Sequence, residues 1–232
     1  PEAIRTQFVA RAEKELKTLV EQKPNDARVH VFFGSFYRSV GNNEEAEKQM
    51  KIARDLSPQK QSIIAQQGIV AYTQVKTDVA RDFFKEAFLL DERNLEAREF
   101  YAAMLVHTGD VEGAKALAID DATLKHFALN DFLLNAVTSA TDTDFTISLY
   151  EARVEQKPES EQNWVSLSYL YYQIKESDKA VDALERGGKA IPTFAKTATC
   201  FANNIKIGHE PQEGCKDSAT TTTSAPVQVP KR

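Results

Sequence analysis

Hydrophobic residues recur along the chain at helical spacing, in segments that are separated by short polar turns. In the stretch from Pro24 to Pro58, one such segment ends at Gly41 and the next begins after Asn43. Glycine takes the left-handed conformation that ends a helix without a Cβ clash, and proline ends the helix that follows. The pattern therefore predicts a pair of antiparallel helices joined by a tight turn.

The same pair recurs with a period of 34 residues, which separates Pro24 from Pro58 and also Pro158 from Pro192. With Ala27 as position 1, characteristic residues of the first unit fall at positions 4, 7, 8, 11, 20, 24, 27 and 32. These are His30, Phe33, Gly34, Tyr37, Ala46, Met50, Ala53 and Pro58. Small residues at positions 8 and 20 let the two backbones approach, and large apolar residues fill the space on either side. The pattern resembles that of the tetratricopeptide repeat (TPR).

The TPR resemblance implies an all-α fold, a right-handed superhelical solenoid of antiparallel helix pairs with about five repeats and flanking helices. We predict repeats over 27–60, 61–94, 95–126, 127–160 and 161–194, of which the fourth is degenerate and two residues out of phase. Residues 1–26 are predicted to be the second helix of a truncated repeat, and residues 195–208 a capping helix. Residues 209–232 are rich in Thr, Ser and Pro, which predicts a disordered tail.

Composition narrows the choice of partners. The chain has 34 acidic and 29 basic residues, which give a net charge of −5 with both signs mixed along the sequence. This is not the pattern of a protein that binds nucleic acid. No apolar run approaches the roughly 20 residues of a membrane-spanning helix, and no signal peptide is recognisable, so we expect no membrane insertion of this chain. Because the first residue is Pro1, we expect a fragment or a processed product.

Candidate chemistry is sparse. The four histidines are His30, His107, His126 and His209, and none belongs to an HExxH or a His-Cys arrangement. The sequence contains no glycine-rich phosphate loop and no nucleophile elbow. We therefore predict no enzymatic activity, no metal and no cofactor. Two cysteines are too few for a disulfide framework, and whether Cys200 and Cys215 pair is left open.

The TPR resemblance places a partner-binding site on the concave face, at positions 2, 5, 9, 12 and 13 of each first helix. Repeat proteins that clamp the C-terminal carboxylate of a chaperone need lysine and asparagine at positions 5 and 9. Val31 and Ser35, followed by Ala65, do not supply them, which disfavours a cochaperone. The predicted binding residues are Arg28, Val31, Ser35, Arg38, Ile69, Tyr72, Glu99, His107, Asn135, Tyr169, Tyr172 and Gln173.

The tyrosines are the most attractive members of this set. Tyr72, and the pair formed by Tyr169 and Tyr172 one turn apart, would offer apolar area together with a hydroxyl group. The alternative is that these rings pack against neighbouring helices.

Two stretches of the chain also resemble a more particular family. They read AEKELKTLVEQKPNDARVHVFFGSFYRSVGNNEEAEKQM and SLSYLYYQIKESDKAVDALERGGKAIPTFAK. Both are similar to the repeat regions that follow the membrane domain in bacterial O-antigen ligase-like polymerase proteins. This resemblance implies a C-terminal portion held outside the cytoplasmic membrane. The catalytic residues of that family lie in its membrane part, so none is carried over.

The leading hypothesis is a non-catalytic protein–protein interaction scaffold that binds a peptide or protein segment in the concave TPR groove. One alternative is a soluble accessory domain of an envelope glycan ligase or polymerase, with the membrane domain of a larger protein as its partner. In that case saccharide binding is expected at Tyr169 and Tyr172. A second alternative is a self-associating structural module. The localisation stays open between the cytoplasm and an extracytoplasmic or periplasmic site.

Overall fold

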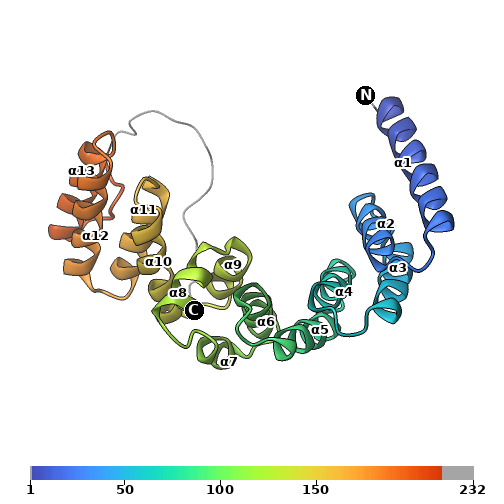
Figure 1. The fold of residues 1–232 in the computed structure, drawn as a ribbon. Helices are drawn as coiled ribbons and strands as arrows, with labels where there is room; N and C mark the ends of the chain where they lie inside the picture. Colours follow the sequence, from blue (N-terminus) through green and yellow to red (C-terminus); the bar gives the residue numbers. More distant parts are fainter. Residues whose placement is uncertain (1, 216–232) are drawn as a thin grey trace. The chain divides into compact units, whose positions relative to one another are not determined.

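The computed structural model describes residues 2–215, and every regular element in that range is an α-helix. The all-α architecture predicted from the sequence is confirmed (Figure 1). The helices are α1 (Glu2–Gln22), α2 (Ala27–Ser39), α3 (Asn43–Leu56), α4 (Gln61–Thr73), α5 (Thr77–Leu90), α6 (Leu95–His107), α7 (Val111–Ala116), α8 (Asp121–Leu129), α9 (Asp131–Ser139), α10 (Thr143–Gln156), α11 (Glu161–Gln173), α12 (Ser177–Ala190) and α13 (Ala195–Lys206). Most of the predicted disordered tail, residues 216–232, lies outside the described residues.

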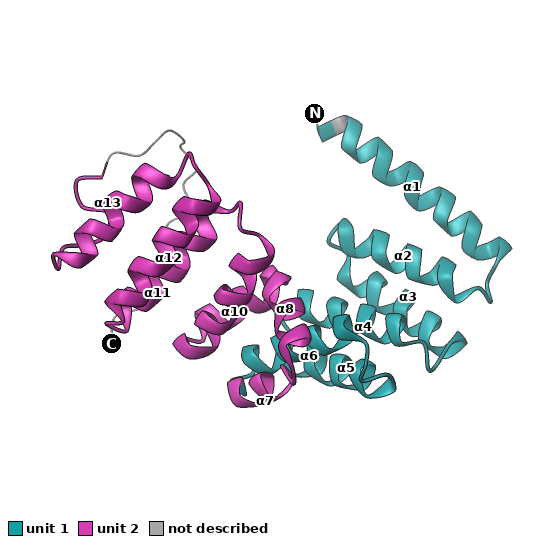
Figure 2. Ribbon diagram, turned by 60° about the vertical axis from the view of Figure 1, so that its left-hand side comes forward, with its two compact units in different colours: residues 1–110 teal, residues 111–232 magenta. Residues whose placement is uncertain are grey.

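The chain divides into two compact units, residues 1–110 and residues 111–232 (Figure 2). In the first unit, α2 pairs with α3 and α4 with α5, and the first helices α2 and α4 also touch each other. In the second unit, α11 pairs with α12, which in turn packs against α13. In each of these pairs, helices that follow one another in sequence are neighbours in space, as expected for stacked hairpins.

The turn between the two helices of a repeat has the same conformation throughout the chain. Gly41 and Gly109 have φ angles of 82° and 90° at position 15 of their repeats. At the same position of the other three repeats, Val75, Thr141 and Lys175 have φ angles of 61°, 60° and 65°. The architecture thus requires a left-handed residue at position 15 even where the sequence supplies no glycine.

Polar side chains begin most of the helices. At seven helix starts, a side-chain oxygen of the N-cap residue accepts a hydrogen bond from a backbone N–H of the first turn, which satisfies a donor that has no partner within the helix. These N-cap residues are Asp26, Asn42, Asn94, Asp120, Asn130, Asp142 and Ser160.

The core of each hairpin depends on a small residue at position 20. In four repeats this residue is an alanine with no exposed surface. In the hairpins α2–α3, α4–α5 and α11–α12, a methyl side chain lets the second helix approach the first closely enough for the large residues beside it to interlock. The four alanines are Ala46, Ala80, Ala114 and Ala180.

The region of the predicted third and fourth repeats departs from simple hairpins. α7 is short, and α8 spans the predicted boundary between residues 126 and 127. Arg153 on α10 occupies position 27 of its repeat. The first, second and fifth repeats have alanine or glycine at this position. The guanidinium of this arginine donates to the carbonyl of Ala128 at 2.7 Å, to Asp131 Oδ1 at 2.5 Å and to Asn163 Oδ1 at 3.3 Å. A buried arginine therefore connects α10 to three neighbouring helices, and a small residue could not do so.

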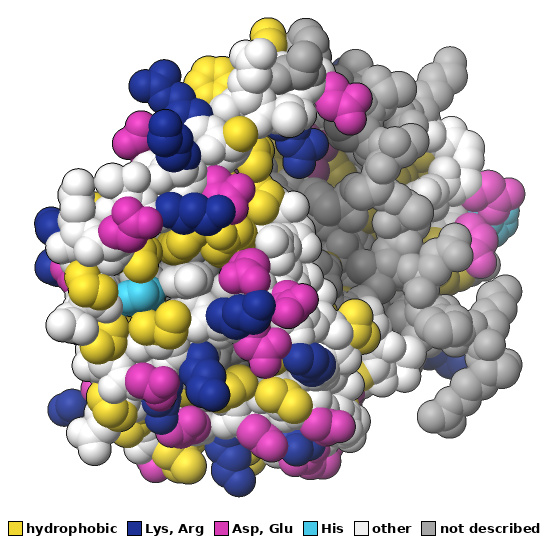
Figure 3. All heavy atoms as spheres, turned by 90° about the vertical axis from the view of Figure 1, so that its right-hand side faces the viewer, with side chains coloured by type: hydrophobic (Ala, Val, Ile, Leu, Met, Phe, Trp, Pro, Cys, Tyr) yellow, Lys and Arg dark blue, Asp and Glu magenta, His cyan; other side chains and the backbone are white. Residues whose placement is uncertain are grey.

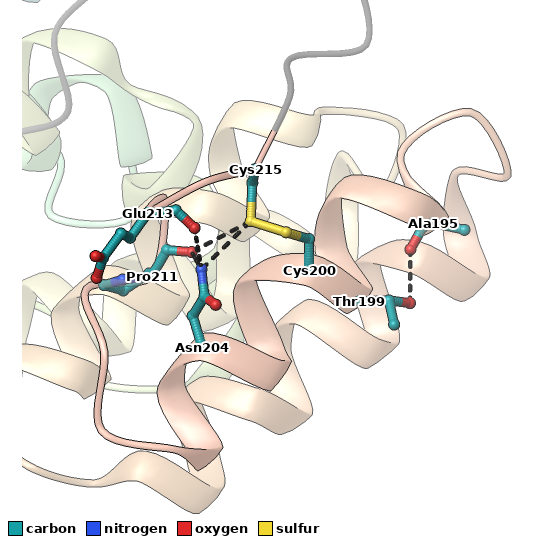
Figure 4. The surroundings of a disulfide bond; sticks show 7 residues. All are labelled: Ala195, Thr199, Cys200, Asn204, Pro211, Glu213 and Cys215. Carbon is teal, nitrogen blue, oxygen red and sulfur yellow. Dashed lines mark hydrogen bonds between the residues drawn. A yellow bond between two sulfur atoms is a disulfide. The ribbon is translucent and has the colours of Figure 1, made fainter.

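The segment after α13 is fixed to that helix. A disulfide joins Cys200 to Cys215 with their Cα atoms 5.9 Å apart (Figure 4), so the pairing that the sequence left open is formed. The side-chain amide of Asn204 donates to the carbonyls of Pro211 and Glu213 at 3.0 and 2.7 Å. Residues 209–215 were predicted as the start of the disordered tail, and these covalent and hydrogen bonds order them despite their polar composition.

Candidate functional site

The predicted groove residues of the first unit all lie on the first helices of its repeats. α2 carries Arg28, Val31, Ser35 and Arg38, α4 carries Ile69 and Tyr72, and α6 carries Glu99 and His107. Since α2 and α4 touch each other, the predicted residues of these two helices lie on neighbouring first helices.

Two of these residues meet directly. The hydroxyl of Tyr72 on α4 lies 3.5 Å from Nε2 of His107 on α6, and the two ring centroids are 5.4 Å apart. Partial burial lowers the pKa of His107 below its ordinary value, because it removes water that would stabilise the charged ring. The pair is therefore an uncharged aromatic surface with polar atoms at neutral pH.

Arg38 is the most informative residue of this surface. It occupies position 12 of its repeat, as Tyr72 does in the next, and it is half-buried on α2. Its Nε atom is shielded from solvent and makes no hydrogen bond within residues 2–215. A buried donor without an acceptor costs free energy, so turning this side chain outward to meet an acceptor of a partner molecule would relieve that cost.

Two other predicted residues are already engaged or covered. The guanidinium of Arg28 binds the carboxylate of Asp26, with Nε–Oδ1 and Nη2–Oδ2 distances of 3.0 and 2.8 Å. These bonds lower the pKa of Asp26 to about 2. Glu99 is only 8% exposed, which leaves little of its carboxylate available to a partner.

In the second unit, the predicted residues lie on α9 and α11. Asn135 and Gln173 are exposed, and Tyr169 and Tyr172 are half-buried. Between these two tyrosines, the hydroxyl of Tyr171 donates to Glu151 Oε1 at 3.0 Å, so this ring points toward α10. Burial first, and then the nearby Glu151 carboxylate, raise the pKa of Tyr171 to about 12.

A second hollow, which the sequence analysis did not predict, lies on another side of α4. It has a volume of about 530 Å³ and is lined by α3, α4 and α5. Its residues on α4 are Gln67, Val70 and Ala71, none of which belongs to the predicted groove. The signal was present in the sequence, because Gln67 and Ala71 stand at positions 7 and 11, where the first repeat has Phe33 and Tyr37.

The side chains on one face of the molecule are mixed in character. On the face shown in Figure 3, basic, acidic and hydrophobic side chains are interspersed, and no broad area carries one sign of charge. Within residues 2–215, no group of three or more His, Cys, Asp or Glu residues is arranged to hold a metal ion. None of the helices described has the length and apolar character needed to span a bilayer.

Comparison with known proteins supports the fold. No protein-family model and no curated protein matches this sequence. Among solved structures, a TPR protein from Parabacteroides merdae has a TM-score of 0.55 at 11% identity, over 89% of this chain and 82% of that one. YrrB, described as a TPR protein with an unusual peptide-binding site, has a TM-score of 0.52 at 18% identity, over 76% of this chain and 92% of that one. Yeast Tom70 has a TM-score of 0.51 at 22% identity, over 84% of this chain and 43% of that one.

These likenesses place the chain among proteins with the TPR fold, as the 34-residue pattern predicts. At such identities they establish the architecture alone. The resemblance to O-antigen ligase-like proteins and the predicted binding residues remain predictions.

Proposed function

We propose that this chain is a non-catalytic interaction scaffold, and that the first-helix surface of α2, α4 and α6 binds an extended segment of a partner protein. The observation that carries the proposal is Arg38, whose buried Nε donor has no acceptor within the described part of the chain. Once the Arg38 side chain turns outward, a backbone carbonyl or a carboxylate of a bound segment would satisfy this donor.

The neighbouring helices α4 and α6 carry further side chains of the kinds that bind peptides. The Tyr72–His107 pair supplies aromatic area with polar atoms, and Ile69 lies one turn before Tyr72 on α4. Aromatic residues and arginine are the side chains most enriched at binding hot spots. YrrB, which shares the fold, is described as having a peptide-binding site, and this supports a peptide as the class of ligand.

The proposal can be tested by selecting short random peptides on the immobilised full chain and measuring their affinities for variants. Arg38→Met and Tyr72→Ala should each weaken the selected peptides by about tenfold or more, since each removes a central contact. Arg93→Met is the control, because it removes an exposed arginine from the turn after α5 and should change nothing. Selected peptides that bind both groove variants as tightly as the original chain would place the ligand elsewhere.

The disulfide favours a second candidate. Disulfides persist in oxidising compartments and are rare in the cytosol, so the Cys200–Cys215 bridge supports an extracytoplasmic site. We propose as the alternative an accessory domain of an envelope glycan ligase or polymerase that presents Tyr169 and Tyr172 to saccharide. Backbone amide shifts on adding envelope oligosaccharides would test it. No change at these two tyrosines would remove this candidate.

Exposed aromatic residues favour a third candidate, a self-associating module. Phe8 on α1 and Phe32 on α2 are 70% and 67% exposed. Light scattering over a range of concentrations distinguishes this candidate, because a concentration-independent monomer would exclude it.

A further inference from the structure

The hollow between α3, α4 and α5 has the features of a small-molecule site. Its volume of about 530 Å³ falls in the range that ligand pockets usually occupy. Val79 and Phe83 contribute apolar surface to its lining, and the fully buried Met50 lies in its wall. Glu47 and Gln67 provide a few polar atoms. An apolar cavity with few polar groups is the usual composition of such pockets.

The repeat pattern shows what is missing from this hollow. Six lining residues each lie 34 positions after a residue of α1 or α2. Glu47, Met50, Lys51, Gln67, Val70 and Ala71 correspond in this order to Glu13, Leu16, Lys17, Phe33, Phe36 and Tyr37. The hollow in the second repeat therefore corresponds in position to the contact between α1 and α2.

In the α1–α2 contact, two aromatic rings fill the corresponding space. Phe33 and Tyr37 stack with their centroids 4.4 Å apart, and they are 3% and 6% exposed. The Tyr37 hydroxyl donates to Glu13 Oε1 at 3.1 Å. A tyrosine ring and its bond to a glutamate thus close the contact between two successive repeats.

In the second repeat, Gln67 and Ala71 stand in place of the two aromatic residues. The glutamate that accepts the hydrogen bond has a counterpart there. Glu47 takes the place of Glu13, and its Oε2 accepts from Gln74 Nε2 at 3.0 Å and Lys76 Nζ at 3.1 Å. These bonds lower the pKa of Glu47, so it is a carboxylate at neutral pH. Oε1 of Gln67 is shielded from solvent and accepts no hydrogen bond within residues 2–215.

We propose that the hollow binds a phenol whose ring lies where the first repeat places the ring of Tyr37, and whose hydroxyl donates to the carboxylate of Glu47. A rotation of the Gln67 amide toward the hollow would let its oxygen accept from a second hydroxyl or another donor of the ligand. The cavity is larger than one ring, so a substituted phenol fits. This site shares no residue with the proposed peptide surface and does not depend on it.

The chain contains a pair of reporters suited to the test, because its two methionines differ in position. Met50 lines the hollow, while Met104 lies on α6, fully buried and away from the lining. With the methionine methyl groups labelled with ¹³C in the full chain, p-cresol should shift the Met50 signal in a saturable manner and leave Met104 unchanged. The methyl ether 4-methylanisole should bind about tenfold more weakly, because it cannot donate to a charged acceptor.

Two variants address the proposed contacts. Glu47→Gln should reduce the preference for p-cresol over its ether to about threefold or less, because it removes the charge from the acceptor. Glu44→Gln, at an exposed site in the first turn of the same helix, should leave the preference unchanged. Ala71→Tyr should abolish the Met50 response by filling the hollow, and the Met104 signal reports whether that variant is folded.

A second probe identifies the source of the phenol. N-acetyltyrosinamide that binds as tightly as p-cresol would indicate a tyrosine side chain of a partner, and binding of p-cresol alone would indicate a free phenol. The proposal is overturned if p-cresol gives no saturable Met50 shift up to its solubility, if the ether binds equally well, or if both methionines respond alike.

Discussion

The second and fifth repeats have the same helix pair but fill it with different side chains. At positions 4 and 27, the second repeat combines Ile64 with Ala87, and the fifth combines Trp164 with Gly187. Trp164 is 4% exposed, and a Cβ atom at Gly187 would lie 2.6 Å from its Cγ. Because Trp164 is larger than isoleucine, the facing position on the second helix has room for glycine but not for alanine.

The same exchange occurs at positions 8 and 24. The second repeat pairs Gly68 with Phe84, and a Cβ atom at Gly68 would come within 2.9 Å of the phenyl ring. The fifth repeat pairs Ser168 with the smaller Leu184, and the serine hydroxyl donates to the buried carbonyl of Ala180 at 2.8 Å. The comparison teaches that a repeat specifies the combined volume of facing positions rather than the residue at each one.

The largest expected effect comes from Gly187→Ala. The new methyl group would collide with the base of the Trp164 ring, which cannot move without its helix, so we expect a loss of about 3 kcal/mol of stability. Denaturant unfolding followed by the fluorescence of this single tryptophan measures it. Gly188→Ala is the matched control, since its nearest atom would be Ala195 Cα at 3.3 Å. Equal losses in the two variants would contradict the argument.

Introducing the residue pair of the second repeat into the fifth repeat should restore stability to the Gly187→Ala variant. Adding Trp164→Ile to Gly187→Ala recreates the Ile–Ala pair, and we expect the double variant to recover much of the stability that Gly187→Ala loses. Circular dichroism at increasing denaturant follows this variant, which lacks the tryptophan. A double variant less stable than both single variants would show that a smaller side chain at one position does not compensate for a larger one at the facing position.

Gly68→Ala should have a smaller effect. Its new methyl group would press on the far edge of the Phe84 ring, which can tilt, so we expect a loss of about 2 kcal/mol. Combining it with Phe84→Leu, the choice of the fifth repeat, should cost less than the two changes added together. Double-mutant cycles by denaturant unfolding give this coupling, and strict additivity would contradict it.

Val75→Asn should increase the stability of the protein by about 1 kcal/mol. Val75 is 85% exposed at φ 61°, a conformation that is strained for a β-branched residue and tolerated by asparagine. The control is Ile207→Asn, because Ile207 is 67% exposed at a negative φ of −100° and has no such strain to lose. Thermal and denaturant unfolding should show stabilisation for the first change and none for the second.

An effect of the same size as that of Val75→Asn concerns Tyr171. Its folded-state pKa of about 12 lies above the ordinary value of 10, so folding favours the neutral phenol. This contribution is fully present below pH 10 and is lost as the pH rises toward 12. Tyr171→Phe removes the bond to Glu151, at a cost of about 1 kcal/mol near neutral pH. The difference between the two proteins should shrink between pH 10 and 12, and a constant difference would contradict this assignment.

The helix pairs could be predicted from the sequence because the 34-residue pattern combines local and packing signals. Gly41 and Pro58 mark helix ends by backbone chemistry, and Ala46 marks a close approach of two helices. These signals need no knowledge of distant residues, so they predict an all-α repeat fold without a structure.

Other features depend on contacts that the pattern does not encode. The role of Arg153 follows from a carbonyl and two side chains on neighbouring helices, and the 127–160 region therefore resembles a degenerate repeat in sequence. The Cys200–Cys215 bridge depends on a turn that returns the chain to α13. For the groove, positions 2, 5, 9, 12 and 13 name candidates such as Arg38 and Glu99, but only the burial of each side chain distinguishes an unsatisfied donor from a covered carboxylate.

The central claim is that residues 34 positions apart are structurally equivalent, so that the second repeat lacks a tyrosine that the first one has. The most direct test is the free energy of unfolding of Ala71→Tyr. If the claim holds, the new ring fills the hollow and its hydroxyl reaches Glu47, and stability rises by about 1 kcal/mol. A loss of stability of similar size would show that the space is not the counterpart of the Tyr37 site and would contradict the account.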